Sequence, residues 1–545
     1  MCRFIPIFFL TLLLAAPASA EPQLESERPY RGNAVAEKIH DQCERLSHNK
    51  PASLGAAPEL LSLRLERFYA ARGFQPLWTS GAMIDEFLAS VEAASDDGLT
   101  PSDYHITRLK ALVANPPLTP EQQAQYDILL TKSLLTLASH LRYGKINPAR
   151  LDPYWNISAD RDLFALDEHL QQAITVSPIS AVLQGLSPQD STYAHLKKGL
   201  ALYRLIARQG GWQPLPATGL SMKLGERDSR IPLLRQRLQV SGDLPFVPSV
   251  DTSRVYGADI AEAVKRFQKR NALYADGTVG TTTLRMMNMS VEQRIGQIRV
   301  NLERHRWFIH DLKPTCIVVN VPNYTLQYIE NGRIRWMTKV IVGQPKRPTP
   351  IFKADMQYIV FNPKWVVPET VLAKDVLPAL NKDNTYLQKK QLRVVDQEGS
   401  TINPESVDWS QYSASTLPYR LQQRSGDKGA LGRIKFMMPN RHTVYLHDTS
   451  SKELFSNTRR ALSSGCIRVQ YPAELARLVL QDSVRWSATK IQESIKSGKT
   501  RSVTLPKQIP VFLLYVTALP NGEEIQFRDD IYNRDKKVLK ALDVR

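Results

Sequence analysis

Apolar residues recur at helical spacing over much of the N-terminal part of the chain, between about residues 56 and 215. Proline and glycine separate the periodic stretches, as in residues 97–101. Because no constellation of titratable side chains stands out among them, the pattern predicts a helical scaffold domain over residues 21–227. The clearest periodic stretches are residues 60–68, 84–91 and 129–141.

A second, more compact helical pattern follows over residues 228–290. Its apolar positions cluster in three short stretches, which contain Leu234, Val264 and Leu284. The pattern predicts a three-helix packing unit, and residues 291–313 are expected to form a linker helix behind it.

From residue 314 the helical spacing gives way to the alternation that is typical of strands. Asn331-Gly332 between two apolar runs is a strong hairpin signal. The strand pattern stops between about residues 369 and 430, which predicts an inserted cap, and it returns at residues 434–437. The β-rich domain is expected to cover residues 314–545, so the chain as a whole is predicted to be an α+β multidomain protein.

One histidine and one cysteine in this domain are candidates for catalysis. A thiolate is a nucleophile only when something keeps it deprotonated, and a nearby imidazole is the usual device. His447 lies in a strand-like segment, and Cys466 follows a Ser-Ser-Gly turn. Cys466 is therefore a candidate nucleophile, and His447 would take its proton and hold a thiolate–imidazolium pair. The alternative is a small buried cysteine and an ordinary packed histidine.

The period-2 geometry of strands adds polar neighbours to this pair. If residues 443–448 are extended, Tyr445 and His447 share one face, opposite two apolar side chains. The same parity places Ser464, Cys466 and Arg468 together, provided that Gly465 does not break the strand. Trp365, near the start of the insertion, is a further candidate for lining the cleft, with packing in the core as the alternative.

The first twenty residues have the layout of a secretory signal: Arg3, an apolar run and the small-residue end Ala18-Ser19-Ala20. Residues 1–20 are therefore predicted to be a cleaved signal peptide, with an uncleaved N-terminal anchor as the alternative. No later stretch is apolar enough for a membrane helix, so no stable membrane span is expected after cleavage.

Cleavage would leave three cysteines, Cys43, Cys316 and Cys466. An odd number in an oxidising compartment leaves at least one thiol free or paired between chains. A Cys43–Cys316 disulfide and a buried thiol at Cys316 are both compatible with the sequence. A Cys316–Cys466 disulfide would exclude catalysis by Cys466.

The chain carries a net charge of +18, of which Arg3 is the only charge in residues 1–20. For an exported protein such a balance suits cell-wall polymers or anionic lipid surfaces. The sequence shows no zinc-ligand spacing or aromatic RNA-binding signature, so no nucleic acid partner is expected. No metal and no organic cofactor are implied.

Two segments resemble known families of wall proteins. Residues 263–268 and the turn at residues 276–280 look like the peptidoglycan-binding domain of many wall enzymes. Residues 445–449 and 463–469 resemble the active-site signature of L,D-transpeptidases, which cross-link peptidoglycan through a cysteine thioester. Gly343 and residues 348–352 resemble the substrate-side loop of the same domain, and the order of domains resembles the large periplasmic members.

The family's commoner pattern has His before the Gly-Cys pair and Asn two residues after the Cys, whereas this chain has Ser464 and Arg468. The large periplasmic members carry the Ser and Arg version, so the resemblance implies a subtype located in the periplasm. It also implies peptidoglycan stem peptides as partners, with a tetrapeptide donor and an amine acceptor, alongside other wall-synthesis enzymes.

The resemblance implies a 3→3 transpeptidase in which backbone N–H groups around Gly465 and Cys466 face the oxyanion. Arg468 would pair with a substrate carboxylate, with a surface ion pair as the alternative, and Tyr445 would position substrate or pack. Two other functions compete: a hydrolase with the same nucleophile, which trims D-alanine or releases wall-bound protein, and a wall-binding scaffold in which Cys466 is structural.

Overall fold

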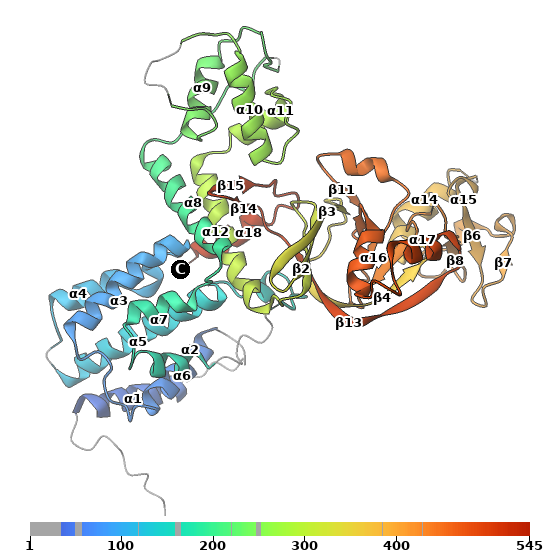
Figure 1. Cartoon of the computed structure of the whole chain (residues 1–545). Helices are drawn as coiled ribbons and strands as arrows, with labels where there is room; N and C mark the ends of the chain where they lie inside the picture. The colour runs from blue at the N-terminus through green and yellow to red at the C-terminus, as the bar shows by residue number, and fades with distance from the viewer. Residues whose placement is uncertain are drawn as a thin grey trace, which may run out of the picture.

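The protein is represented by a computed structural model that describes residues 34–48, 57–117, 119–157, 165–219, 221–246, 252–383, 385–427 and 429–544. Three lobes extend from a common centre, where α8 (Ser191–Arg208) packs on α12 (Val291–Phe308), as Figure 1 shows. The expected α+β multidomain class is confirmed. The predicted signal peptide, residues 1–20, lies outside the described residues.

The first lobe is helical, as its periodicity predicts. The 24-residue helix α5 runs through it and begins at a capping box, in which Thr119 and Gln122 each accept the other's backbone N–H. The buried carboxylate of Asp127 on α5 accepts the hydroxyl of Tyr69 and the N–H groups of Leu77 and Trp78, so the lobe buries no unpaired oxygen there. The helices of the lobe are α1 (Ala34–His48), α2 (Ala57–Ala70), α3 (Gly81–Ala93), α4 (Ile106–Ala114), α5 (Pro120–Tyr143), α6 (Leu166–Ala173) and α7 (Ile179–Leu186).

The second lobe is the predicted three-helix unit, built from α9 (Ile231–Val240), α10 (Ala258–Arg270) and α11 (Thr281–Met287). One apolar cluster fills it, with Leu234, Val264 and Phe267 at its centre. The buried side chain of Gln268 donates to Thr278 O and accepts Gly277 N–H, which fastens the turn before α11 to α10.

The helix that residues 291–313 were expected to form is present as α12 and continues into the 3₁₀ turn η4 (Ile309–Asp311). It is buried along most of its length, because all three lobes pack against it. Its fully buried Arg306 and Glu303 form an ion pair of 2.6 Å, and Arg306 also donates to Asp97 O and the Tyr193 hydroxyl in the helical region.

The third lobe is a sheet of nine strands in the order β11-β3-β12-β10-β9-β4-β13-β1-β2, and an additional β2–β3 pairing closes it on itself. The predicted hairpin is confirmed: β2 and β3 are joined at Asn331 and Gly332, both with positive φ, as a tight hairpin turn requires. Helix α16 (Pro472–Leu480) packs on the barrel core, and α17 (Ala488–Lys496) packs on α16. The strands are β1 (Cys316–Asn320), β2 (Thr325–Glu330), β3 (Arg333–Gly343), β4 (Phe352–Phe361), β9 (Ile434–Met437), β10 (Leu446–His447), β11 (Ala461–Ser463), β12 (Ile467–Val469) and β13 (Arg501–Leu514).

The inserted cap has a sheet of its own, so the prediction that strands stop between residues 369 and 430 was wrong. Four short strands pair in the order β5-β8-β6-β7 over an apolar cluster that includes Leu380, Val394 and Leu421. Polar residues separate these strands, which hides them from a period-2 search. The elements are β5 (Trp365–Val366), α13 (Glu369–Val371), the π-helix η5 (Leu372–Val376), α14 (Leu377–Leu380), α15 (Tyr386–Lys389), β6 (Leu392–Val395), β7 (Thr401–Ile402) and β8 (Arg420–Gln423).

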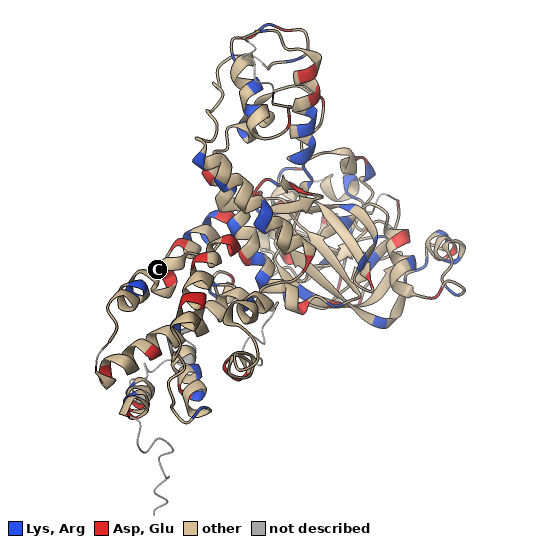
Figure 2. Cartoon of the chain, turned by 60° about the vertical axis from the view of Figure 1, so that its left-hand side comes forward, with Lys and Arg blue, Asp and Glu red and all other residues tan. Residues whose placement is uncertain are grey.

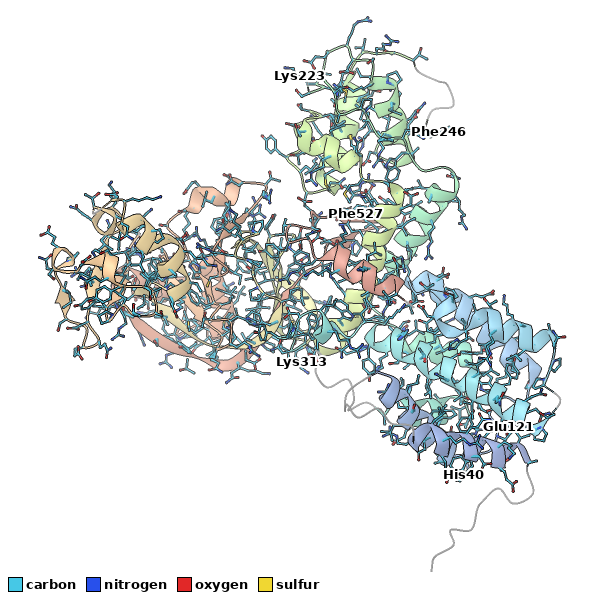
Figure 3. The ribbon with its side chains drawn as sticks, turned by 180° about the vertical axis from the view of Figure 1, so that it is seen from behind. His40, Glu121, Lys223, Phe246, Lys313 and Phe527 are labelled. Atoms are coloured by element: carbon cyan, nitrogen blue, oxygen red, sulfur yellow. The ribbon has the colours of Figure 1, made fainter. Side chains whose placement is uncertain are left out.

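The chain leaves the β lobe before its end, whereas the β-rich domain was expected to continue to residue 545. The hairpin of β14 (Ala518–Asn521) and β15 (Glu524–Phe527) packs on α8, and α18 (Asp535–Asp543) packs on α12. Phe527 lies where the lobes meet (Figure 3). The C-terminal segment therefore fastens the β lobe to the centre of the molecule.

The basic residues are spread over the whole molecule. Figure 2 shows Lys and Arg on all three lobes rather than on one face. In the ranges that the structure describes, no helix has both the length and the apolar character needed to cross a bilayer.

Candidate functional site

Cys466 lies in a tight turn between β11 and β12. Gly465 has φ +119, a conformation that side-chain-bearing residues rarely adopt. The strand is therefore interrupted, and the condition for placing Ser464 on the same face as Cys466 and Arg468 is not met. Ser464 is exposed, whereas Cys466 is half-buried.

Hydroxyl groups of two neighbouring segments hold this turn. The Ser463 hydroxyl donates to Cys466 O at 2.6 Å and accepts Gly465 N–H at 3.1 Å. Thr349 donates its hydroxyl to Gly465 O at 2.8 Å and accepts Gly343 N–H at 2.9 Å. Because the Gly465 N–H is already bonded, Cys466 N–H remains as the candidate donor for an oxyanion.

His447 is buried in β10, next to β12 in parallel register, where it is the Cα partner of Arg468. Its Nδ1 lies 2.5 Å from Asp448 O. A carbonyl oxygen only accepts, so Nδ1 carries the proton and Nε2 is left as the basic nitrogen.

The electrostatics of the site favour a neutral imidazole at His447 and a neutral thiol at Cys466. Burial and the nearby charge of Arg468 lower the pKa of His447 to about 3. Burial also raises the pKa of the Cys466 thiol, although hydrogen bonds from Tyr445 and the charges of Lys435 and Arg468 oppose this rise. The expected resting thiolate–imidazolium pair is therefore disfavoured, because burial penalises both charges and the two cations Arg468 and Lys435 act on the imidazole.

Tyr445 lies beside the thiol, and Trp365 lies beside Tyr445. The Tyr445 hydroxyl hydrogen-bonds Cys466 and also Trp365, whose indole N–H can only donate. The Tyr445 backbone also bonds Cys466, and Sγ lies 3.9 Å from Thr443 O. Trp365 packs against the cap's apolar cluster as well, so it joins the cap to the Cys466 site.

Arg468 and Ser464 occupy different environments beside the turn. Arg468 is half-buried on β12, and its buried Nε has no hydrogen-bond partner among the described residues. Ser464 accepts from Arg347, which also forms a bidentate pair with Asp375 of the cap at 2.5 and 2.6 Å. Arg347 thus connects the cap's π-helix to the residue two positions before Cys466.

Sequence reasoning missed Lys435 and Arg347, whereas Thr349 lies in the segment 348–352 that resembles the substrate-side loop. Lys435 alternates with buried Ile434 and Phe436 on β9, which marks it as facing away from the core. The alternation alone does not give the strand pairing, so it could not place Lys435 opposite His447.

The cysteines of the described residues form no disulfide with one another. Burial raises the pKa of Cys43 to about 12 and that of Cys316 to about 11. The alternatives of a Cys43–Cys316 or a Cys316–Cys466 disulfide are therefore not realised, and Cys466 is the half-buried thiol of the three.

A group of possible metal ligands lies apart from this site. Among the described residues, His40, Asp41 and Glu44 on α1 place ligand atoms within 4.8 Å of one another. Figure 3 shows His40 at the outer end of the helical lobe, near Glu121 and away from the β lobe. These side chains are at least partly exposed, and nothing indicates that they hold an ion.

Comparison with family models divides the chain in the order of its lobes. Residues 64–200 match a scaffold domain, and residues 227–287 match the "Putative peptidoglycan binding domain". Residues 314–492 match the L,D-transpeptidase catalytic domain (YkuD), and this range contains Cys466 and the other residues described around its turn.

A curated protein of Haemophilus influenzae, described as "Putative L,D-transpeptidase", is 37% identical over 222 residues. The match covers 41% of this chain and 45% of that protein, so the chain spans less than half of its relative's length.

Two solved structures are also similar. The L,D-transpeptidase (residues 123–326) of Xylanimonas cellulosilytica is 16% identical and covers 55% of this chain and 100% of its own, with a TM-score of 0.16. The L,D-transpeptidase of Stackebrandtia nassauensis is 13% identical and covers 54% and 94%, with a TM-score of 0.20. The family models and the curated relative thus support an assignment by region: residues 314–492 are an L,D-transpeptidase catalytic domain, and a scaffold domain and a peptidoglycan-binding domain precede it.

Proposed function

We propose that this protein is a peptidoglycan L,D-transpeptidase that forms 3→3 cross-links between stem peptides through a Cys466 thioester. The observation that carries the proposal is the surroundings of the thiol. Cys466 is half-buried in a fixed turn, is hydrogen-bonded by Tyr445, and directly precedes β12, which carries Arg468 and pairs with the strand of His447.

In the proposed acylation, the Sγ–H proton moves to Nε2 of His447 as sulfur attacks the carbonyl carbon of the L–D bond. That bond joins the L-centre of meso-diaminopimelate to D-alanine in a tetrapeptide stem. The new S–C bond forms, the C–N bond breaks, and the proton passes from Nε2 to the D-alanine amine as it leaves. An amine on a second stem then attacks the thioester, and its proton returns through His447 to sulfur.

Substrate binding supplies a reason for His447 to accept a proton despite its low pKa. Arg468 is one of the cations that disfavour the imidazolium. A substrate carboxylate paired with the Arg468 guanidinium would cancel this charge and make protonation of His447 easier. The N–H of Cys466 would face the developing oxyanion, and losing such a donor typically costs about 10²–10³ in rate.

The location that fits this substrate is the periplasm, with residues 1–20 acting as a cleaved signal peptide. A protein matched to peptidoglycan-binding and L,D-transpeptidase domains acts at the wall. In that compartment other wall-synthesis enzymes would meet it on the same polymer.

The products formed from tetrapeptide muropeptides test the proposal. We expect the purified protein to release D-alanine and to form 3→3 dimers, identified by tandem mass spectrometry. Tripeptide monomers without dimers would indicate the competing hydrolase, because water rather than an amine would then take the thioester. Absence of both products would contradict the proposal.

Carbapenems are expected to acylate Cys466. The strained β-lactam carbonyl would meet the same nucleophile as the L–D peptide bond, and ring opening would leave a stable thioester. Intact-mass spectrometry should show one adduct per chain, and peptide mapping should place it on Cys466 rather than on buried Cys316. A folded protein that gains no adduct would count against a reactive thiol at this position.

A further inference from the structure

Three basic side chains lie in one row across neighbouring strands of the β lobe. Lys435 on β9 is the Cα partner of His447 on β10, and His447 is in turn the partner of Arg468 on β12. Side chains at directly paired positions project from the same face of a sheet. Lys435, His447 and Arg468, which we call the basic row, therefore face one side together.

The basic row contains no acidic residue of its own. Lys435 is half-buried, and no described residue gives its ammonium a hydrogen bond or ion pair. Arg468 has a buried Nε without a hydrogen-bond partner in the described residues, and Glu453 is the acid whose charge acts on it. Like charges on adjacent strands repel, so this row is stabilised when an anion lies beside it.

The contacts of Lys435 indicate which anion this is. Its Nζ lies 3.8 Å from the centre of the Tyr445 ring, a close cation–π contact. The hydroxyl of that ring hydrogen-bonds Cys466. The charges of Lys435 and Cys466 also act on each other, with the ammonium favouring the thiolate.

We infer that Lys435 is a positioning residue for the nucleophile: its ammonium stabilises the thiolate of Cys466 and holds the Tyr445 ring beside the sulfur. The inference rests on the proposed role of Cys466 as nucleophile. It adds a cation on β9 to that of Arg468 on β12, since the buried His447 is neutral at rest. The charged and titratable groups around the thiol are Lys435 from β9, Tyr445 and His447 from the β10 segment, Arg468 from β12 and, beyond it, Glu453.

The pH dependence of Cys466 alkylation tests this role directly. A cation near a thiol favours the thiolate and lowers the thiol pKa, commonly by about one unit or more. Lys435→Met keeps the length and apolar stem of the side chain, so we expect its thiol pKa to rise by about one unit, with alkylation by iodoacetamide about tenfold slower at neutral pH. Peptide-resolved mass spectrometry reads Cys466 separately from the buried Cys43 and Cys316.

Two matched variants control this measurement. Lys435→Arg should return the thiol pKa most of the way to that of the wild type, because the charge is restored. Lys339→Met removes an exposed lysine of the same sheet, on β3, and should leave the thiol pKa unchanged. An unchanged thiol pKa in folded Lys435→Met, judged by circular dichroism, would overturn the inference.

A second measurement needs only the wild type. We expect iodoacetate to react with Cys466 several-fold faster, relative to iodoacetamide, than it does with free cysteine, because the basic row attracts the anionic reagent. A ratio equal to that of free cysteine would overturn the inference. Both measurements omit peptidoglycan, so they remain separate from the muropeptide assay, in which failure to form product would instead count against the proposed function.

Discussion

Cys466→Ala is expected to abolish both release of D-alanine and formation of 3→3 dimers, lowering the rate by about 10⁴-fold or more, as loss of a nucleophile does in other acyl-transfer enzymes. Without Sγ no thioester forms. The oxyanion donor and the neighbouring cations are still present in Cys466→Ala, but there is no thiol for them to assist. Liquid chromatography with tandem mass spectrometry of the muropeptide products measures the loss.

Cys316→Ala is the matched control for this variant. Cys316 lies in the same domain, at the start of β1, and is buried with a raised pKa. Its removal should leave the products unchanged, apart from a small loss of stability on truncating a buried thiol. Dimers made equally well by folded Cys466→Ala would refute a thioester mechanism and favour a wall-binding scaffold.

The candidate pair His447 and Cys466 could be found from the sequence because local rules describe its surroundings. Period-2 alternation separated the apolar face of residues 443–448 from the polar one, and Val444 and Leu446 do lie in the core. The turn at Gly465 could be anticipated, but its effect could not: the positive φ interrupts the strand and turns Ser464 toward solvent.

Pairings between distant segments account for what the sequence did not predict. Lys435 reaches His447 through an antiparallel register that no local pattern specifies. Helix α12 has the composition of an exposed connector because it contains charged residues such as Arg306 and Glu303. These two side chains are buried as an ion pair, and a hydropathy profile does not show that pairing. The return of β14, β15 and α18 to this helix likewise depends on tertiary contacts alone.

The cap and the Cys466 turn are mechanically connected through one loop. Residues 344–350 follow β3; Arg347 binds Asp375 in the cap, and Thr349 binds the carbonyl of Gly465. A π-helical turn such as η5, which carries Asp375, is frequent at functional sites. This loop therefore joins the cap to the turn that holds Cys466.

Gly343→Ala is expected to displace this loop. A Cβ at residue 343 would lie 2.2 Å from Arg347 O, 2.7 Å from Thr349 N and 3.0 Å from Pro348 C. All three are backbone atoms, so no side-chain rotation relieves the clash and the loop itself must move. Overpacking of this kind costs about 1–3 kcal/mol of stability. Displacing Thr349 would also release the carbonyl of Gly465, and a misplacement of about 1 Å near a nucleophile can cost about 10²-fold in rate.

Thermal unfolding and the rate of carbapenem adduct formation measure the two effects of Gly343→Ala separately. Gly426→Ala is the matched control, because a Cβ there meets nothing within 4 Å and its φ is not in the left-handed region. It should unfold and acylate as the wild type does. If Gly343→Ala kept the wild-type rate while losing stability, the loop would support the fold without positioning Cys466. If it kept both, the close packing of this loop against β3 would have no influence on the site, and the contact from Thr349 to Gly465 could not be what holds the nucleophile in place.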